Sequence, residues 1–124
     1  MHKGILKTAL LLSAFSVILG AFAAHALKKN VDAGSVSIFE TGVRYQFYHA
    51  FAILISGILY KEFNQKIILK AYYSFLIGVL LFCGSLYVLT IMSDYSWIGI
   101  ITPFGGLSFI IGWCLLFYAV YKQS

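Results

Sequence analysis

Long apolar runs separated by short polar stretches make up most of this sequence. A helix that crosses a bilayer needs about 20 predominantly apolar residues. Three charge-free runs reach that length and a fourth is shorter, so the predicted spans cover residues 8–27, 45–60, 71–93 and 103–121. The pattern therefore predicts an all-α integral membrane four-helix bundle that forms a single domain over residues 1–124.

The second run, residues 45–60, is the shortest and has the most polar approach. Its helix is expected to begin earlier, at about Ser35, and to enter the membrane through an interfacial amphipathic lead-in. Glu40 and Arg44 stand four residues apart with the acid first, which is the favourable order for an ion pair on a helix. The stretch before residue 45 is therefore predicted to be helical.

The fourth apolar run contains the single proline of the chain, Pro103. Proline is best tolerated in the first turn of a helix, where its missing N–H would have no partner. Thr102 is then the expected N-cap, and residues 94–102 form an outer loop. A re-entrant turn through Gly99 is the alternative, since irregular backbone is tolerated at membrane depth only where protein or water surrounds it.

The composition agrees with a lipid environment: 61% of the residues are hydrophobic, 10% are charged, and the mean hydropathy is +0.91. The net charge of +5 is scattered in ones and twos, which argues against nucleic acid as a partner. Cytoplasmic loops of membrane proteins collect Lys and Arg. With four spans, one side carries Lys3, Lys7, Lys61, Lys66, Lys70 and Lys122, and the other carries Lys28, Lys29 and Arg44. Both termini are therefore predicted to be cytoplasmic.

Small residues recur four apart within each run, as at Ala52 and Ser56. Membrane helices pack closely where such residues line up, so they are expected to mark the helix contacts. Gly105 and Gly106 follow Pro103 within one turn and leave no side chain between the backbone and its neighbour. Close helix packing is the expected use of this gap, and a bound ligand is the alternative.

Polar and ionisable residues inside membrane spans are costly and mark candidate functional sites. In this chain they are expected to gather on the outer side of the first two helices. The members of this polar cluster are His25, Glu40, Arg44, Tyr45, Tyr48 and His49.

Three interpretations of the polar cluster remain open. In the first, Glu40 and Arg44 neutralise each other and the histidines hydrogen-bond between helices, which would fix the first helix to the second. In the second, His25 and His49 titrate along a proton or ion path. In the third, His25, His49 and Glu40 bind a metal, although their spacing matches no metal-ligand motif.

No nucleophile elbow, phosphate-binding glycine loop, catalytic carboxylate pair or Cys-x-x-Cys motif occurs in the sequence. We therefore expect no catalytic, cofactor-binding or metal-binding residue, and no cofactor. The expected function is that of a structural or accessory protein in the cell envelope. Its expected partners are the bilayer and either a second copy or another membrane protein. The alternative is a small oligomeric transporter or channel that uses the polar cluster.

Four segments together resemble the YgdD-like family of small bacterial inner-membrane proteins of unknown function (domain of unknown function 423). They are Gly20-Ala-Phe-Ala-Ala-His-Ala-Leu27, Phe39-Glu-Thr-Gly-Val-Arg-Tyr-Gln-Phe-Tyr-His-Ala50, Gly84-Ser-Leu-Tyr87, and Ile101-Thr-Pro-Phe-Gly-Gly106 with Gly112-Trp113. One departure is an alanine, Ala23 or Ala24, where a glycine is expected before the histidine.

The resemblance implies a multi-pass protein of the bacterial inner membrane, and it supplies no reaction, substrate or partner. It places His25, Glu40, Arg44, Tyr45, His49 and Pro103 in the family's signature segments. The N-terminus also imitates a secretory signal peptide, although its apolar run exceeds the about 7–15 residues of a signal core. The resemblance implies that this first helix is retained.

Overall fold

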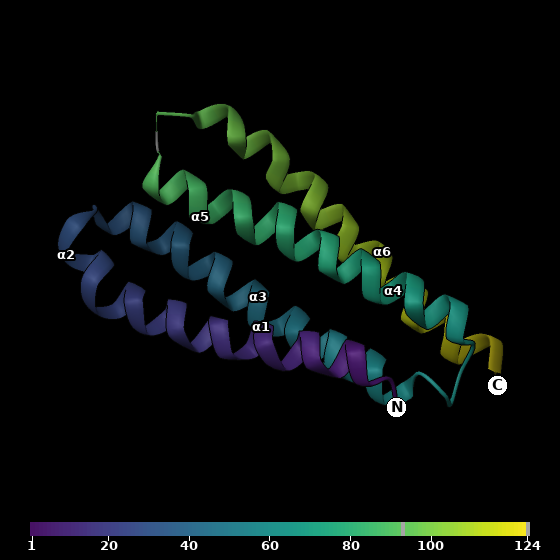
Figure 1. Cartoon of the computed structure of the whole chain (residues 1–124). Coiled ribbons are helices and arrows are strands. Elements are labelled where there is room, and N and C mark those ends of the chain that lie inside the picture. The colour runs from purple at the N-terminus through teal and green to yellow at the C-terminus, as the bar shows by residue number, and fades with distance from the viewer. Residues whose placement is uncertain (93, 124) are drawn as a thin grey trace.

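A computed structural model of the chain describes residues 1–92 and 94–123, and every regular element in them is helical (Figure 1). The long helices form two hairpins that lie against each other. The chain ends and the α3–α4 connection lie at one end of the molecule, and the α2–α3 and α5–α6 connections lie at the other. This arrangement confirms the predicted all-α class.

The first hairpin consists of α1 (Lys3–Phe22), continued by the π-helical segment η1 (Ala23–Leu27) and α2 (Lys28–Asn30), and of α3 (Ala33–Leu59). The Asp32 side chain caps α3 by accepting hydrogen bonds from the Ser35 backbone N–H at 3.3 Å and from the Ser35 hydroxyl at 2.7 Å. An aspartate at this position satisfies a backbone donor that has no partner in the first turn. The helical start expected near Ser35 is therefore confirmed.

The second hairpin begins with α4 (Gln65–Gly78), the π-helical segment η2 (Val79–Cys83) and α5 (Gly84–Ile91). The Asn64 side chain caps α4 by accepting from the Ile67 N–H at 3.1 Å. This continuous helix begins six residues before the predicted third span, 71–93, and contains it up to Ile91; the last predicted residue, 93, lies outside the described residues.

The chain returns through a 3-10 segment, η3 (Ser96–Ile100), directly into α6 (Ile101–Gln123). Helix α6 therefore begins at Ile101, and the prediction of a start at Pro103 with Thr102 as its N-cap is wrong. The first four N–H groups of a helix lack an intrahelical partner, so Pro103 fits inside the first turn without being its first residue. The Thr102 hydroxyl instead bonds the Ser85 hydroxyl of α5, with 2.5 Å between the oxygens.

Within residues 1–92 and 94–123, three helices are long and apolar enough to cross a membrane: Lys3–Asn30, Gln65–Ile91 and Ser96–Lys122. Helix α3 is of similar length, with 27 residues, but it carries Arg44 and His49 within its central part. These polar side chains lower its hydropathy.

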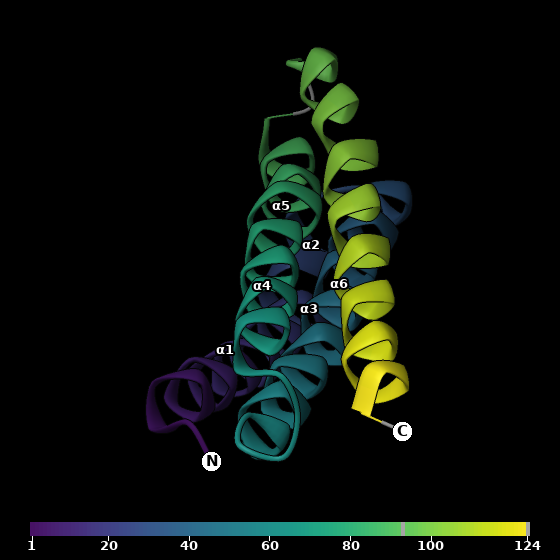
Figure 2. The ribbon, with the colours of Figure 1, turned by 90° about the vertical axis from the view of Figure 1, so that its right-hand side faces the viewer.

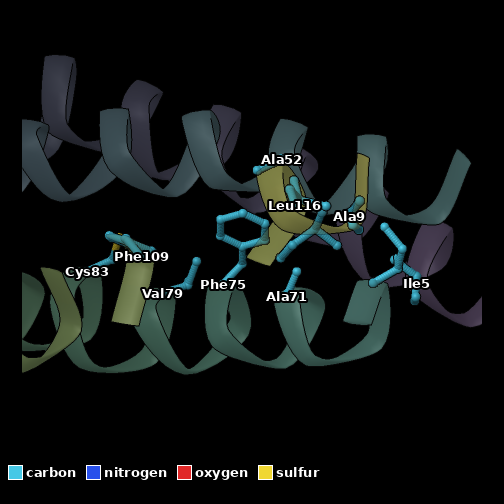
Figure 3. Packing of buried hydrophobic residues seen from close by; sticks show 12 residues of the cluster. Ile5, Ala9, Ala52, Ala71, Phe75, Val79, Cys83, Phe109 and Leu116 are labelled. Atoms are coloured by element: carbon cyan, nitrogen blue, oxygen red, sulfur yellow. The ribbon is translucent and has the colours of Figure 1, made fainter. Parts of the chain in front are cut away.

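Helix α3 packs along α1 on one side and along α4, η2 and α5 on another, while α6 packs on α4 and η2. Figure 2 shows α1 and α6 on opposite flanks of the molecule. The core lies between the hairpins, where Phe75 points from α4 into the space between Ala52 of α3 and Leu116 of α6 (Figure 3). A Cβ atom at Gly112 would come within 2.6 Å of the Phe75 ring, so glycine at that position makes room for the ring.

Candidate functional site

The fold divides the predicted polar cluster, because His25 and Glu40 lie apart from His49. His25 lies exposed in η1, at the end of the first long helix. Glu40 is also exposed and lines a cavity of about 330 Å³ with Lys28, beside the turn into α3. His49 is buried near the middle of α3, about four turns from that end. Among the described residues, His25, Glu40 and His49 form no group that could hold a metal.

His49 uses both of its ring nitrogens in hydrogen bonds, one within α3 and one to α6. Its Nδ1 lies 2.7 Å from the carbonyl oxygen of Tyr45, one turn earlier, and its Nε2 lies 3.1 Å from the indole Nε1 of Trp113. An indole N–H can only donate and a carbonyl can only accept. Nε2 must therefore be the unprotonated nitrogen and Nδ1 the protonated one, so these two bonds require the neutral imidazole.

Aromatic rings enclose the His49 side chain, which is 5% exposed. The Phe109 ring stacks on the imidazole with 3.5 Å between ring centroids and 8° between planes. Phe75 lies on another side, with 5.8 Å between centroids. The imidazole is thus held by flat apolar faces as well as by its two hydrogen bonds, and its orientation is fixed.

A groove of about 620 Å³ opens beside this histidine, between α3, η2 and α6. Its lining is mostly apolar and aromatic. The residues that line it are Tyr45, His49, Phe82, Pro103, Gly106, Leu107, Phe109, Ile110 and Trp113. The volume lies in the range of about 300–1,000 Å³ that is usual for sites that bind small molecules.

The two adjacent glycines of α6 have different roles at this groove. A Cβ atom at Gly105 would come within 2.3 Å of the Phe82 backbone nitrogen, so α6 touches η2 backbone to backbone. A Cβ atom at Gly106 would lie 3.9 Å from the nearest atom of the Phe82 ring, which is ordinary contact, and Gly106 lines the groove. The expected close helix contact is confirmed for Gly105, whereas Gly106 leaves space for another molecule.

Three polar side chains of the predicted cluster lie at or near the groove. The Tyr45 side chain is 37% exposed, and its hydroxyl forms no hydrogen bond with any described residue. Tyr48 lies beside it, with 5.7 Å between ring centroids. Arg44 is exposed and donates from Nη2 to the Thr41 hydroxyl at 3.1 Å. Within the described residues it forms no ion pair with Glu40, so the expected Glu40–Arg44 pair is not formed.

Gln46 was not among the predicted site residues, yet it connects three helices. Its side chain is 4% exposed; Nε2 donates to the Leu12 carbonyl of α1 at 3.0 Å, and Oε1 accepts from the Tyr87 hydroxyl of α5 at 2.7 Å. Positions 39, 42, 46, 49, 53 and 56 of α3 are all buried. Their alternating spacing of three and four marks one helix face and could have identified Gln46 as interior.

Hydrogen bonds between and within helices account for the interior polar atoms. Among the described residues, no buried side-chain nitrogen or oxygen lacks a hydrogen-bond partner. In the second hairpin, the Ser108 hydroxyl donates to the Ser74 carbonyl at 2.6 Å, which joins α6 to α4. Such bonds are the usual means by which polar groups are accommodated between helices in a bilayer.

Comparison with known proteins gives a family match without a known activity. A family model described as a protein of unknown function (DUF423) matches residues 19–106. The UPF0382 membrane protein of Haemophilus influenzae is 42% identical over 110 residues, which cover 89% of this chain and 87% of the relative. The UPF0382 inner membrane protein YgdD of Escherichia coli K12 is 40% identical over 103 residues, with 81% and 76% covered. YwdK of Bacillus subtilis is 35% identical over 108 residues, with 86% and 87% covered. No solved structure matches.

Proposed function

This chain belongs to the DUF423 family of membrane proteins, and we propose that it is a non-enzymatic structural or accessory protein of the bacterial cytoplasmic membrane. Its partners are the lipid bilayer and a further membrane protein, either a second copy or a different subunit. The relatives named as inner membrane proteins support the location, and the three long apolar helices support the membrane environment.

In this proposal α3 is a fourth span and both termini face the cytoplasm. Helix α3 has 27 residues, or about 40 Å of helix, which exceeds the about 30 Å thickness of the hydrocarbon core. Two of its central polar side chains, Gln46 and His49, form hydrogen bonds with other helices. Six of the nine basic residues lie at the end that carries both termini, which favours that end as the cytoplasmic one.

The observation that carries the proposed function is the use of both His49 nitrogens in hydrogen bonds within the protein. A histidine that relays protons needs a nitrogen free to gain and lose one. Protonation of Nε2 would break the bond from Trp113, because an indole N–H cannot accept. The arrangement therefore favours a structural role for His49, joining α3 to α6, over the alternative role in a proton or ion path.

Proton flux in liposomes tests this function directly. The purified protein is reconstituted around a pH-sensitive dye, a pH step is imposed, and wild type is compared with His49→Ala and with empty liposomes. The pH gradient is expected to dissipate at the same slow rate in all three kinds of liposome. Faster dissipation in wild type that His49→Ala abolishes would overturn the structural function in favour of transport.

Single-cysteine labelling in intact cells tests the topology. In a background with Cys83 and Cys114 replaced by serine, Lys29→Cys and Asp94→Cys are expected to react with a membrane-impermeant maleimide from outside. Glu62→Cys and Lys122→Cys are expected to react only after the membrane is permeabilised. Labelling of positions 29 and 62 from the same side would exclude α3 as a span.

A further inference from the structure

The Arg44 guanidinium is an exposed charged group on α3 that forms no ion pair with any described acidic residue. It is exposed, and the Thr41 hydroxyl is the partner of its Nη2. An arginine has five N–H donors, so most of its hydrogen-bonding capacity is unused by the described residues. Glu40, the acid nearest in sequence, lines the separate cavity with Lys28. The fold therefore leaves a cation available to an external anion.

This guanidinium lies close to the depth of the lipid headgroups, on the proposed arrangement in which α3 spans the bilayer. A hydrocarbon core of about 30 Å takes roughly 20 residues of helix, and counting back from Leu59 places its outer boundary at about residue 40. Arg44 lies about one turn inside that boundary and extends back toward Thr41, the direction in which a lipid-exposed arginine reaches the headgroups.

The same guanidinium reaches the side of α3 that leads to the outer end of the groove. Thr41, which it contacts, and Tyr45, which lines the groove, are four residues apart and therefore lie on one face of α3. From Tyr45 the groove continues along α6 from Pro103 to Trp113, about 15 Å of helix. A cationic group and a phenol hydroxyl that bonds no described residue thus stand near the outer end of an apolar groove.

We propose that this groove is a binding site for an anionic phospholipid of the outer leaflet. The lipid phosphate binds Arg44, the Tyr45 hydroxyl donates to a headgroup or ester oxygen, and one acyl chain lies along Gly106, Ile110 and Trp113. The planar guanidinium suits a phosphate because it can donate two parallel hydrogen bonds. The apolar walls and the absent side chain at Gly106 suit a hydrocarbon chain. A lipid with net negative charge is favoured over a zwitterionic one because no described carboxylate forms an ion pair with the cation.

Quenching of Trp113 by brominated lipid tests the site, because this side chain lines the groove and is 44% exposed. Trp97→Phe leaves Trp113 as the single tryptophan. The protein is reconstituted with phosphatidylglycerol or phosphatidylcholine carrying brominated acyl chains, at matched mole fractions. One basic residue near a membrane surface raises the affinity for anionic lipid about fivefold. We therefore expect about a fivefold preference for phosphatidylglycerol.

Two variants assign that preference to the site. Arg44→Gln is expected to lower the preference to near one, and Gly106→Leu is expected to reduce quenching by both lipids because it fills the groove. Lys29→Gln is the matched control: it removes the same charge from the same end of the molecule, away from the groove, and the preference is expected to persist.

Equal quenching by both lipids in wild type, or an equal loss in Arg44→Gln and Lys29→Gln, would overturn the site while leaving α3 as a span. Absence of quenching by either lipid in the folded protein would instead show that Trp113 does not face hydrocarbon. That result would overturn the site together with the proposed arrangement in the membrane.

Discussion

Helix α3 has two very different interfaces. Toward α1 it is closed by a close approach at Gly57, where an added Cβ atom would come within 2.8 Å of the Leu6 side chain, and by the Gln46 side chain, which bonds the α1 backbone. Toward α6 it is held by stacked aromatic rings and by the hydrogen bond from Trp113 to His49. A groove of about 620 Å³ remains open beside the second interface.

The difference shows how residue size sets the distance between membrane helices. Small side chains let backbones approach, so polar groups can reach across to a neighbouring backbone. Aromatic rings keep helices apart and leave space that the rings fill only in part. One helix can thus combine a tight structural contact with an accessible groove, and the next four variants test how sharp that contrast is.

The largest effect is expected where α6 touches η2 beneath the groove. Gly105→Ala places a Cβ atom within 2.3 Å of the Phe82 backbone nitrogen, and backbone on both sides cannot yield. We expect a loss of about 1–3 kcal/mol in the free energy of unfolding, as for other overpacked sites, measured by denaturant titration in detergent micelles. Gly106→Ala is the matched control, with a change within about 0.5 kcal/mol. Equal stability of the two variants would contradict the backbone contact.

The next effect is expected at the closed interface of α3. Gln46→Leu removes the bonds to Leu12 and Tyr87 and leaves the hydroxyl of the half-buried Tyr87 without this partner. The expected loss is about 1–2 kcal/mol, measured in the same titration. Tyr87→Phe keeps the ring and removes one of these bonds, so its loss in the free energy of unfolding should be smaller. If the stability losses of Gln46→Leu and Tyr87→Phe simply add in the double variant, the two side chains are not energetically coupled, which would contradict the hydrogen bond between them.

A smaller effect is expected at the open interface. Trp113→Phe keeps an aromatic ring in the groove and removes the hydrogen bond to His49. Hydrogen bonds between membrane helices average about 0.6 kcal/mol, and a loss of about that size in the free energy of unfolding is expected. Trp97→Phe serves as the control with no measurable change. A loss at Trp113 larger than that of Gln46→Leu would reverse the comparison between the interfaces.

The smallest effect is expected at the turn between α2 and α3, where Asp32 caps the helix that both interfaces share. Hydrogen bonds from the Ser35 side chain and backbone lower the pKa of Asp32 below its ordinary value. A lowered pKa contributes stability above the unfolded pKa of about 3.9 and loses it as the pH falls through the folded value. Asp32→Asn keeps a capping oxygen but cannot titrate. The midpoint difference between wild type and Asp32→Asn in thermal unfolding should therefore shrink below about pH 4; a constant difference would contradict the role of the charge.

The hydrophobic pattern predicted the helices well because their length and apolar character are local properties of the chain. The start of α3 near Ser35 followed from the short length of the apolar run and from the polar stretch before it. The start of α6 did not, because a proline marks the first turn of a helix and not its first residue, and η3 continues directly into Ile101.

The candidate site was less predictable because it depends on which helices become neighbours. His25 and His49 lie on consecutive helices, yet the fold exposes one and buries the other against α6. The bond from Trp113 to His49 joins residues 64 positions apart, which no local pattern reveals. Gln46 could have been identified from its spacing on the buried face, although its partners on α1 and α5 could not.

The bond between Gln46 and the Leu12 carbonyl also bears on how the chain enters the membrane during synthesis. Helix α3 leaves the ribosome after α1, so this acceptor is already in the bilayer when Gln46 arrives, whereas Tyr87 and Trp113 have yet to be translated. An amide without a partner in hydrocarbon is costly. In the proposed arrangement, where α3 spans the bilayer, insertion of this least apolar of the long helices therefore depends on its pairing with α1, and the first hairpin enters the bilayer as a unit.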